Sequence, residues 1–256
     1  MASIFDTHAH YDADAFNEDR AALLAALPEQ GVCAVISCAT DPTSIAANLA
    51  LAEQYPYIRV AVGFHPEAVA QATPDWMDTL REAAAHPAVC AIGEIGLDYY
   101  WEDNAPREVQ LDWCRKQIEL AKELDLPVIF HDREAHEDTL NLLREMKPRG
   151  VLHCFSGSVE MARQITDLGM YIGLGGATTF KNARKPVEVA AALPADRLLL
   201  ETDAPYMAPV PLRGKRCDSS MIAHTAARIA EIRGVDMDTL LEQTRRNANT
   251  LFGLDL

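Results

Sequence analysis

The chain has 256 residues, of which 49% are hydrophobic and 24% are charged, and its formal net charge at pH 7 is −15. This composition is typical of a folded protein with a large apolar core and excludes general disorder. The acidic charge excludes an extended non-specific nucleic-acid surface, because such a surface needs a basic stripe that releases counterions. The sequence has no run of 18 apolar residues and no signal-peptide pattern, which predicts a cytoplasmic protein without a membrane partner.

Short apolar segments rich in β-branched residues alternate along the chain with segments of helical periodicity. The predicted strands, in chain order, are IFDTH (4–8), VCAVISC (32–38), IRVAVGF (58–64), VCAIGEI (89–95), PVIFH (127–131), GVLHC (150–154), MYIGLG (170–175) and RLLLET (197–202). Apolar residues recur at helical spacing between them, in segments 20–31, 43–55, 75–85, 108–124 and 136–146. Strands that alternate with helices predict parallel β–α–β units and therefore an α/β fold.

Eight apolar strands buried on both faces favour a closed (β/α)8 TIM barrel, because closure of the sheet removes its exposed edges. An open, doubly wound sheet is the alternative fold for the same order of elements. Barrels of this kind take about 250 residues, so residues 1–256 are expected to form a single domain. Helix starts are predicted at Thr43–Ser44 and at Ser158, because hydroxyl oxygens accept hydrogen bonds from the first turn of a helix.

Histidines and carboxylates follow the ends of the predicted strands, where barrel enzymes build their active sites. Five of the eight histidines and three carboxylates lie there, namely Asp6, His8, His10, His65, Glu94, His131, His153 and Asp203. One buried histidine alone is more often a core residue bonded to a backbone carbonyl than a metal ligand. The coincidence of so many at strand ends favours metal binding, whereas His86, His136 and His224 are interpreted as surface or structural residues.

The predicted metal ligands are imidazoles and carboxylates, namely His8, His10, Glu94, His131, His153 and Asp203. His8 and His10 point to the same side of an extended segment, so both rings can reach one ion. Ligands of these types without thiolate suit Mg²⁺, Mn²⁺, Fe²⁺ or Zn²⁺. Since a carboxylate has two oxygens, Glu94 can bridge two ions that share a water. We therefore expect one or two divalent metal ions.

Catalytic roles are predicted for Glu94, as the bridging carboxylate, and for Asp203, which would orient the attacking water and take its proton. Glu201 is expected to hold a histidine ring from behind. The residues expected to bind an anionic substrate are His65, Arg133, Ser156, Arg213 and Lys215. Exposed arginine and lysine side chains more often belong to the solvated surface. The basic residues named here are assigned to substrate binding because they lie beyond strand ends.

The ordered motifs of this chain resemble those of the TatD family of metal-dependent hydrolases. The motifs are FDTHAHYD, GFHPE, IGEIGLDYYW, FHDREA, LHCFSGS, YIGLGG, ETDAPYMAP, RGKR and RRNANTLFG, and they span nearly the whole sequence. The resemblance implies an amidohydrolase-like barrel with divalent metal at the six ligands named above. It also implies hydrolysis of phosphodiester bonds in DNA, commonly as a 3′–5′ exonuclease. A deoxyribonuclease that acts on DNA ends or small nucleic-acid substrates is therefore the expected function.

Two departures from the family pattern concern substrate recognition. The segment after RGKR usually continues with Asn, an acidic residue and Pro, but here it continues with Cys217 and Asp218. Glu67 stands where the family frequently has a histidine. These differences keep open a hydrolase of a small phosphoester, a carboxylic ester or an aminoacyl-tRNA ester. A protein that holds metal without turnover is disfavoured, because a purely structural site has no use for an open water position.

Overall fold

Parallel strands form a barrel in the computed structural model, which describes residues 3–256. Each strand pairs with the next in the sheet order β1 to β8. The strands are β1 (Ile4–Ala9), β2 (Val32–Cys38), β3 (Ile58–Val62), β4 (Val89–Asp98), β5 (Val128–Arg133), β6 (Gly150–Leu152), β7 (Tyr171–Leu174) and β8 (Leu198–Leu200). All eight predicted strands are confirmed.

The sheet closes through the residues that follow β8. The backbone N–H of Asp203 donates to the carbonyl of His8 (2.9 Å), and the N–H of His10 donates to the carbonyl of Ala204 (2.7 Å). These bonds join the last strand to the first, so the predicted (β/α)8 barrel is confirmed and the open doubly wound sheet is excluded.

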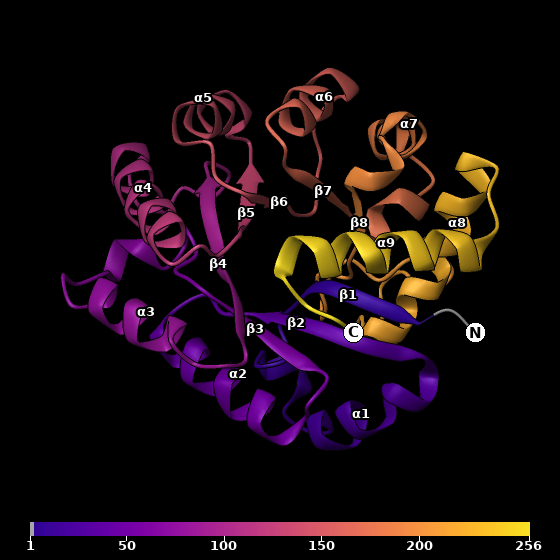
Figure 1. The fold of residues 1–256 in the computed structure, drawn as a ribbon, viewed down its shortest axis with the longest axis horizontal. Coiled ribbons are helices and arrows are strands. Elements are labelled where there is room, and N and C mark those ends of the chain that lie inside the picture. Colours follow the sequence, from indigo (N-terminus) through magenta and orange to yellow (C-terminus); the bar gives the residue numbers. More distant parts are fainter. Residues whose placement is uncertain (1–2) are drawn as a thin grey trace.

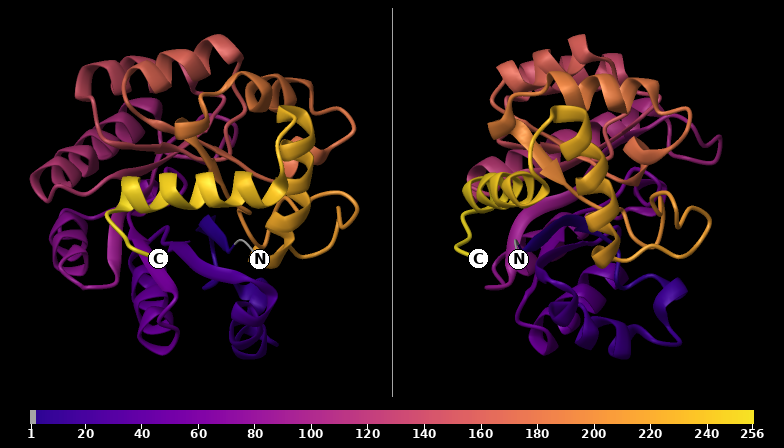
Figure 2. Two further views of the ribbon diagram at one scale, coloured as in Figure 1. Left: turned by 45° about the vertical axis from the view of Figure 1, so that its right-hand side comes forward. Right: turned by 90° about the vertical axis from the view of Figure 1, so that its right-hand side faces the viewer.

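Helices surround the barrel on its outside (Figure 1). Within residues 3–256 the α-helices are α1 (Arg20–Ala26), α2 (Pro42–Gln54), α3 (Trp76–Ala84), α4 (Arg107–Glu123), α5 (His136–Met146), α6 (Val159–Asp167), α7 (Arg184–Ala192), α8 (Ile222–Arg233) and α9 (Met237–Phe252). The last of them, α9, lies across one end of the barrel (Figure 2). None of the helices described for residues 3–256 is long and apolar enough to cross a membrane.

The predicted helix starts are correct to within two residues. Ser158 caps α6, because its hydroxyl accepts the N–H of Met161 at 3.3 Å. The start of α2 lies earlier than the predicted Thr43–Ser44. Asp41 is its capping residue and accepts the N–H of both Thr43 (2.7 Å) and Ser44 (2.9 Å), while Pro42 occupies the first helical position. A carboxylate followed by proline is a strong combined start signal.

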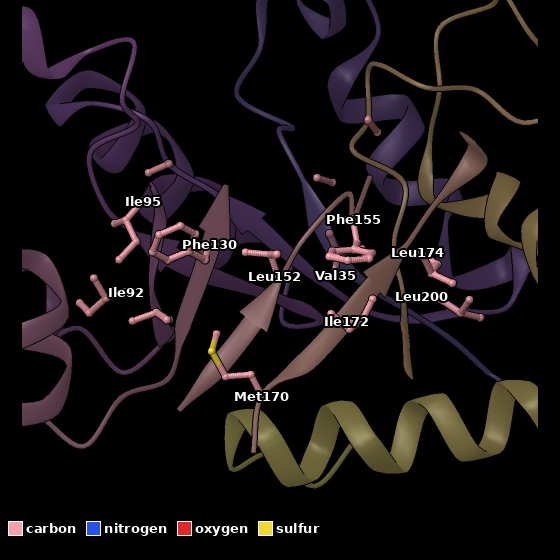
Figure 3. Close-up of a cluster of buried hydrophobic side chains, with 14 of the residues drawn as sticks. Val35, Ile92, Ile95, Phe130, Leu152, Phe155, Met170, Ile172, Leu174 and Leu200 are labelled. Atoms are coloured by element: carbon pink, nitrogen blue, oxygen red, sulfur yellow. The ribbon is translucent and has the colours of Figure 1, made fainter. Parts of the chain in front are cut away.

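Alternate residues of each strand face two separate apolar layers. The outward layer packs between strands and helices, and Figure 3 shows part of it around Phe130, Leu152 and Ile172. The inward layer fills the barrel and is covered by side chains of α9; it includes Phe5, Ala34, Ile36, Ala61, Ala91, Ile129, Val151, Tyr171, Leu199, Leu251 and Phe252. The end of the barrel next to α9 is therefore closed by apolar packing.

Polar residues replace the apolar ones on the inward face towards the other end of the barrel. His131 comes two residues after the inward Ile129, and His153 comes two residues after the inward Val151. Because side chains in a strand alternate with a period of two, these rings also face the barrel axis. The fold thus brings histidine side chains together at the carboxyl ends of the strands.

Candidate metal centre

Glu94 lies between two pairs of histidine rings. Its Oε2 atom is 3.3 Å from His8 Nε2 and 3.4 Å from His10 Nε2. Its Oε1 atom is 2.9 Å from His131 Nδ1 and 2.6 Å from His153 Nε2. Each oxygen of the single carboxylate therefore belongs to a different cluster of ring nitrogens. The two clusters share Glu94 as a bridge.

The first cluster consists of His8, His10, Asp203 and the Oε2 atom of Glu94. The Nε2 atoms of His8 and His10 are 3.1 Å apart, and Asp203 Oδ1 lies 3.7 Å and 3.4 Å from them. His10 Nδ1 lies 2.9 Å from the carbonyl of Cys38. Since a carbonyl only accepts, the Nδ1 atom carries a proton, and the Nε2 atom is turned towards the cluster. His8 and His10 thus point to the same side of the segment, as predicted, with their Nε2 atoms 3.1 Å apart.

The second cluster consists of His131, His153 and the Oε1 atom of Glu94, with 3.2 Å between His131 Nδ1 and His153 Nε2. Behind the His131 ring, Nε2 lies 3.1 Å from Oδ2 of the fully buried Asp98. Burial opposes protonation of the His131 ring, but the hydrogen bonds to Asp98 and Glu94 outweigh it and raise its pKa to about 10. Asp98 fixes which nitrogen of His131 faces the cluster.

Asp98 was not among the predicted site residues. The available signal was its position at the carboxyl end of β4, four residues after Glu94. His65, predicted as a substrate contact, has its Nε2 atom 3.6 Å from Glu94 Oε1 and lies close enough to Glu94 and His131 to share a metal ion with them. Burial lowers the pKa of His65 to about 3, so its ring is neutral near pH 7. A neutral ring can serve either as a metal ligand or as a contact to substrate.

Glu201 lies behind His153, and its role differs in detail from the predicted one. Its Oε1 atom is 4.0 Å from His153 Nδ1, which is beyond hydrogen-bond distance, and it accepts the backbone N–H of Cys154 instead. Burial raises the pKa of Glu201 to about 8. A Cβ atom at Gly173 would overlap this carboxyl group, so the glycine leaves the space that Glu201 fills.

Asp6, named with the strand-end residues, lies outside both clusters. The hydroxyl groups of Thr202 and Ser219 each donate to Asp6 Oδ2 at 2.6 Å, and the backbone N–H of Thr202 donates to its other oxygen at 3.0 Å. The buried carboxylate of Asp6 thus holds the segments after β8 against β1.

The carboxylates of the site are ionised in spite of their burial. Burial alone would raise the pKa of Glu94, but the rings of His153 and His8 outweigh it and hold that pKa well below its ordinary value. Burial likewise opposes ionisation of Asp203, and the hydrogen bond from His10 together with the nearby His8 ring lowers its pKa. Both groups are therefore anionic near pH 7 and available as ligands or proton acceptors.

The spacing of these atoms fits a divalent metal ion. Two ligands of a tetrahedral ion with bonds of roughly 2.0–2.1 Å lie about 3.3 Å from each other. The atoms of the first cluster are 3.1–3.7 Å apart, and those of the second are 2.6–3.2 Å apart. Cys38 is nearby, but its Sγ atom lies 3.4 Å from His8 Nδ1, on the side of that ring away from the Nε2 atom that faces the first cluster. Imidazole and carboxylate thus remain the donor types, as expected from the sequence.

Side chains of both clusters line a cleft of about 1380 Å³. Of the predicted substrate-binding residues, His65, Arg133 and Ser156 line this cleft. Arg213 and Lys215 are exposed and are not among its lining residues. The Arg213 guanidinium lies 4.3 Å above the ring of Phe180 instead. A substrate contact through Arg213 or Lys215 therefore stays a prediction that requires a ligand reaching beyond the cleft.

A barrel whose strand ends gather imidazoles and carboxylates at metal-ligand spacing is the arrangement of a metal-dependent enzyme, and the class of this one is that of the metal-dependent hydrolases. More particularly, the chain is a member of the TatD family: the family model described as TatD related DNase matches residues 5–253.

Relatives of the same length support this assignment. The chain is 38% identical over 255 residues to the uncharacterized metal-dependent hydrolase YabD of Bacillus subtilis, covering 98% of this chain and 100% of that protein. It is 34% identical to the 3′–5′ ssDNA/RNA exonuclease TatD of Erwinia amylovora, and the match covers 98% of this chain and 100% of that protein. The crystal structure of the TatD homologue YjjV from Escherichia coli superposes with a TM-score of 0.92 at 36% identity and 98% coverage of both chains.

Proposed function

We propose that this TatD-family hydrolase is a deoxyribonuclease that removes nucleotides from the 3′ ends of DNA, and that residues 1–256 act as one catalytic domain. The observation that carries the proposal is the position of Glu94, whose two oxygens face separate clusters of ligand atoms. Two adjacent ions are the arrangement suited to in-line displacement at phosphorus. The 34% identical relative that is named as an exonuclease supports the same substrate class.

The residues of this chain that would hold the ions follow from the two clusters. His8, His10 and Asp203 would bind one ion and His131 with His153 the other, with Glu94 bridging them. Bound Mg²⁺, Mn²⁺ or Zn²⁺ would lower the pKa of water and stabilise negative charge on the phosphoryl oxygens.

The remaining steps belong to the protein side chains. Asp203 is ionised near pH 7, because its hydrogen bond from His10 outweighs the effect of burial, so it can accept a proton from the attacking water. Arg133 and Ser156 line the cleft beside the clusters and can donate hydrogen bonds to phosphate oxygens. His65 faces the same space and would position the scissile group.

Removal of the metal tests the proposal directly. Chelator-stripped protein is expected to leave end-labelled single-stranded DNA intact, and added Mg²⁺, Mn²⁺ or Zn²⁺ is expected to restore stepwise release of mononucleotides from the labelled strand. The variant His131→Ala, purified in the same way, serves as the control for contaminating nucleases, because it lacks a ring nitrogen that lies 2.9 Å from Glu94. Equal cleavage by this variant would exclude the proposed site.

Arg133 is expected to contribute to binding more than to the chemical step. For Arg133→Ala we expect KM for DNA to rise about tenfold with a smaller change in kcat, since the lost charge-assisted hydrogen bond holds substrate and transition state alike. Steady-state kinetics give the measurement. Arg246→Ala removes the same charge from the exposed side of α9, at the other end of the barrel, and should leave KM unchanged. An unaltered KM for Arg133→Ala would remove this residue from the substrate site.

A second candidate rests on the carboxylates of the cleft. Asp12, Asp41 and Glu67 line it together with Arg133, and their charge favours a substrate with a cationic group, such as an aminoacyl ester on tRNA. A small phosphoester or carboxylic ester would also fit the clusters. Metal-loaded protein that fails to cleave DNA but hydrolyses one of these esters would favour this candidate. Metal-loaded protein that hydrolyses nothing would favour a protein that holds metal without turnover.

A further inference from the structure

Two large aromatic side chains of the cleft are exposed. Trp101 has 50% of its surface accessible and Tyr206 has 60%, and both line the cleft. Their place in the cleft gives both rings access to a ligand, and covering an aromatic ring buries a large apolar area. The metal clusters do not account for either ring, because neither side chain supplies one of their ligand atoms.

The two rings come from opposite sides of the barrel. Trp101 follows β4 and Tyr206 follows β8. In a closed ring with the order β1 to β8, these two strands are four positions apart and therefore face each other across the axis. Glu94 lies in β4 and Asp203 follows β8. The metal clusters thus lie between the two strands that lead into the aromatic side chains, and side chains of both clusters line the same cleft as the rings.

Trp101 is held in place by its neighbours. The Tyr100 ring meets it edge to face, with 4.7 Å between centroids and an interplanar angle of 83°. The Arg133 guanidinium lies 3.8 Å from the centre of the Tyr100 ring and 5.2 Å from that of Trp101. Tyr206 is tied to the catalytic segment, because its backbone N–H donates to the carbonyl of Asp203 at 2.8 Å. The contacts of the Trp101 ring and the backbone bond of Tyr206 restrict these positions, which reduces the entropy lost when a ligand binds.

The size of the cleft admits a chain-like ligand. Its volume of about 1380 Å³ exceeds the about 300–1,000 Å³ typical of small-molecule sites. Arg133, His136 and Lys185 line one part of it. His136 had been interpreted as a surface or structural residue, yet its Nδ1 atom lies 2.6 Å from Asp132 Oδ2 and the hydrogen bond to that carboxylate raises its pKa. Arg133 and Lys185 can each contact a phosphate, while the carboxylates of the cleft oppose a polyanion, so stacking of bases on the exposed aromatic rings would have to supply much of the affinity for a nucleic-acid strand.

We propose that Trp101 and Tyr206 form two nucleobase-stacking subsites, one on each side of the scissile phosphodiester. The proposal rests on the proposed nuclease function and assigns the two aromatic side chains of that site to base recognition. Bases in a duplex are already stacked on their neighbours, whereas single-stranded bases are free to stack on aromatic rings. Every base has a flat π-face, so recognition of this kind tolerates any sequence.

Binding without turnover tests the subsites separately from catalysis. In an Asp203→Asn background with Mg²⁺, fluorescence anisotropy with labelled hexathymidylate is expected to give a Kd about 10- to 100-fold weaker when Trp101→Ala or Tyr206→Ala is added. Trp101→Phe should restore most of the affinity. Val109→Ala, at an exposed position of α4 outside the cleft, is the control and should not change Kd. Unchanged Kd values for both aromatic variants would overturn the proposal.

Abasic substrates provide the second test, with active protein. Replacing the two 3′-terminal bases by abasic units is expected to raise KM for the wild-type protein about 10- to 100-fold, and Trp101→Ala should add no further loss on that substrate. If the effects of the abasic substrate and of Trp101→Ala on KM multiplied fully, the stacking assignment would be overturned while the nuclease function stayed intact. Hexathymidylate that binds through the rings but is never cleaved would refute the nuclease function alone. Absence of any oligonucleotide binding would refute both.

Discussion

Replacement of Glu94 by glutamine is expected to reduce kcat/KM on the order of 10³-fold and to lower the metal content of the purified protein. Glutamine has the size of glutamate, but one carboxylate oxygen becomes an NH₂ group that only donates. Because the two oxygens of Glu94 face separate clusters, one at 3.3 Å from His8 Nε2 and the other at 2.6 Å from His153 Nε2, one cluster necessarily loses its acceptor in Glu94→Gln.

Elemental analysis of the metal and steady-state kinetics measure this prediction together. Glu242→Gln, on the exposed face of α9, is the matched control, because it makes the same chemical change in a surface pair with Arg246. Circular dichroism shows whether the barrel of Glu94→Gln remains folded. A variant that keeps the wild-type metal content and rate would show that Glu94 is not the shared ligand.

The strand pattern explains why the fold and the metal clusters were predictable from sequence. Inward and outward residues alternate, so the inward row that begins with Ile129 continues to His131, and the row that begins with Val151 continues to His153. In a parallel barrel all such rows end at the same face. Local periodicity therefore implied that residues separated by more than a hundred positions, such as His8 and His153, come together; their rings stack at 3.8 Å.

Features that depend on one particular side-chain contact were harder to predict. Asp98 lies at the end of β4 in the same alternating row as Glu94, but its role is defined by its contact with His131, 33 residues away. Arg213 was expected in the substrate site from its place beyond a strand end; its guanidinium packs over Phe180 outside the cleft, so this contact stays a prediction. Loop side chains follow no periodic rule, so which of them turn towards the cleft became apparent only in the three-dimensional arrangement.

Asp203→Asn is expected to lower kcat by about 10²–10⁴-fold while the protein keeps its metal. Asparagine retains one oxygen that can face His8 and His10, but an amide does not accept a proton from water at neutral pH. The backbone of Asp203 has a φ of 62°, a left-handed conformation that asparagine adopts as readily as aspartate, so the loop after β8 should be undisturbed. Asp196→Asn, at an exposed position before β8, is the matched control.

The combination of metal content and rate separates the two carboxylates. Glu94→Gln should lose metal and activity together, because Glu94 contacts both clusters. Asp203→Asn should lose activity alone, because Asp203 contacts only the first cluster and acts there as an anionic proton acceptor, its pKa lowered by the hydrogen bond from His10 in spite of burial. If Asp203→Asn also emptied the site, Asp203 would be chiefly a ligand, and proton transfer from water would have to pass to another group of the cleft.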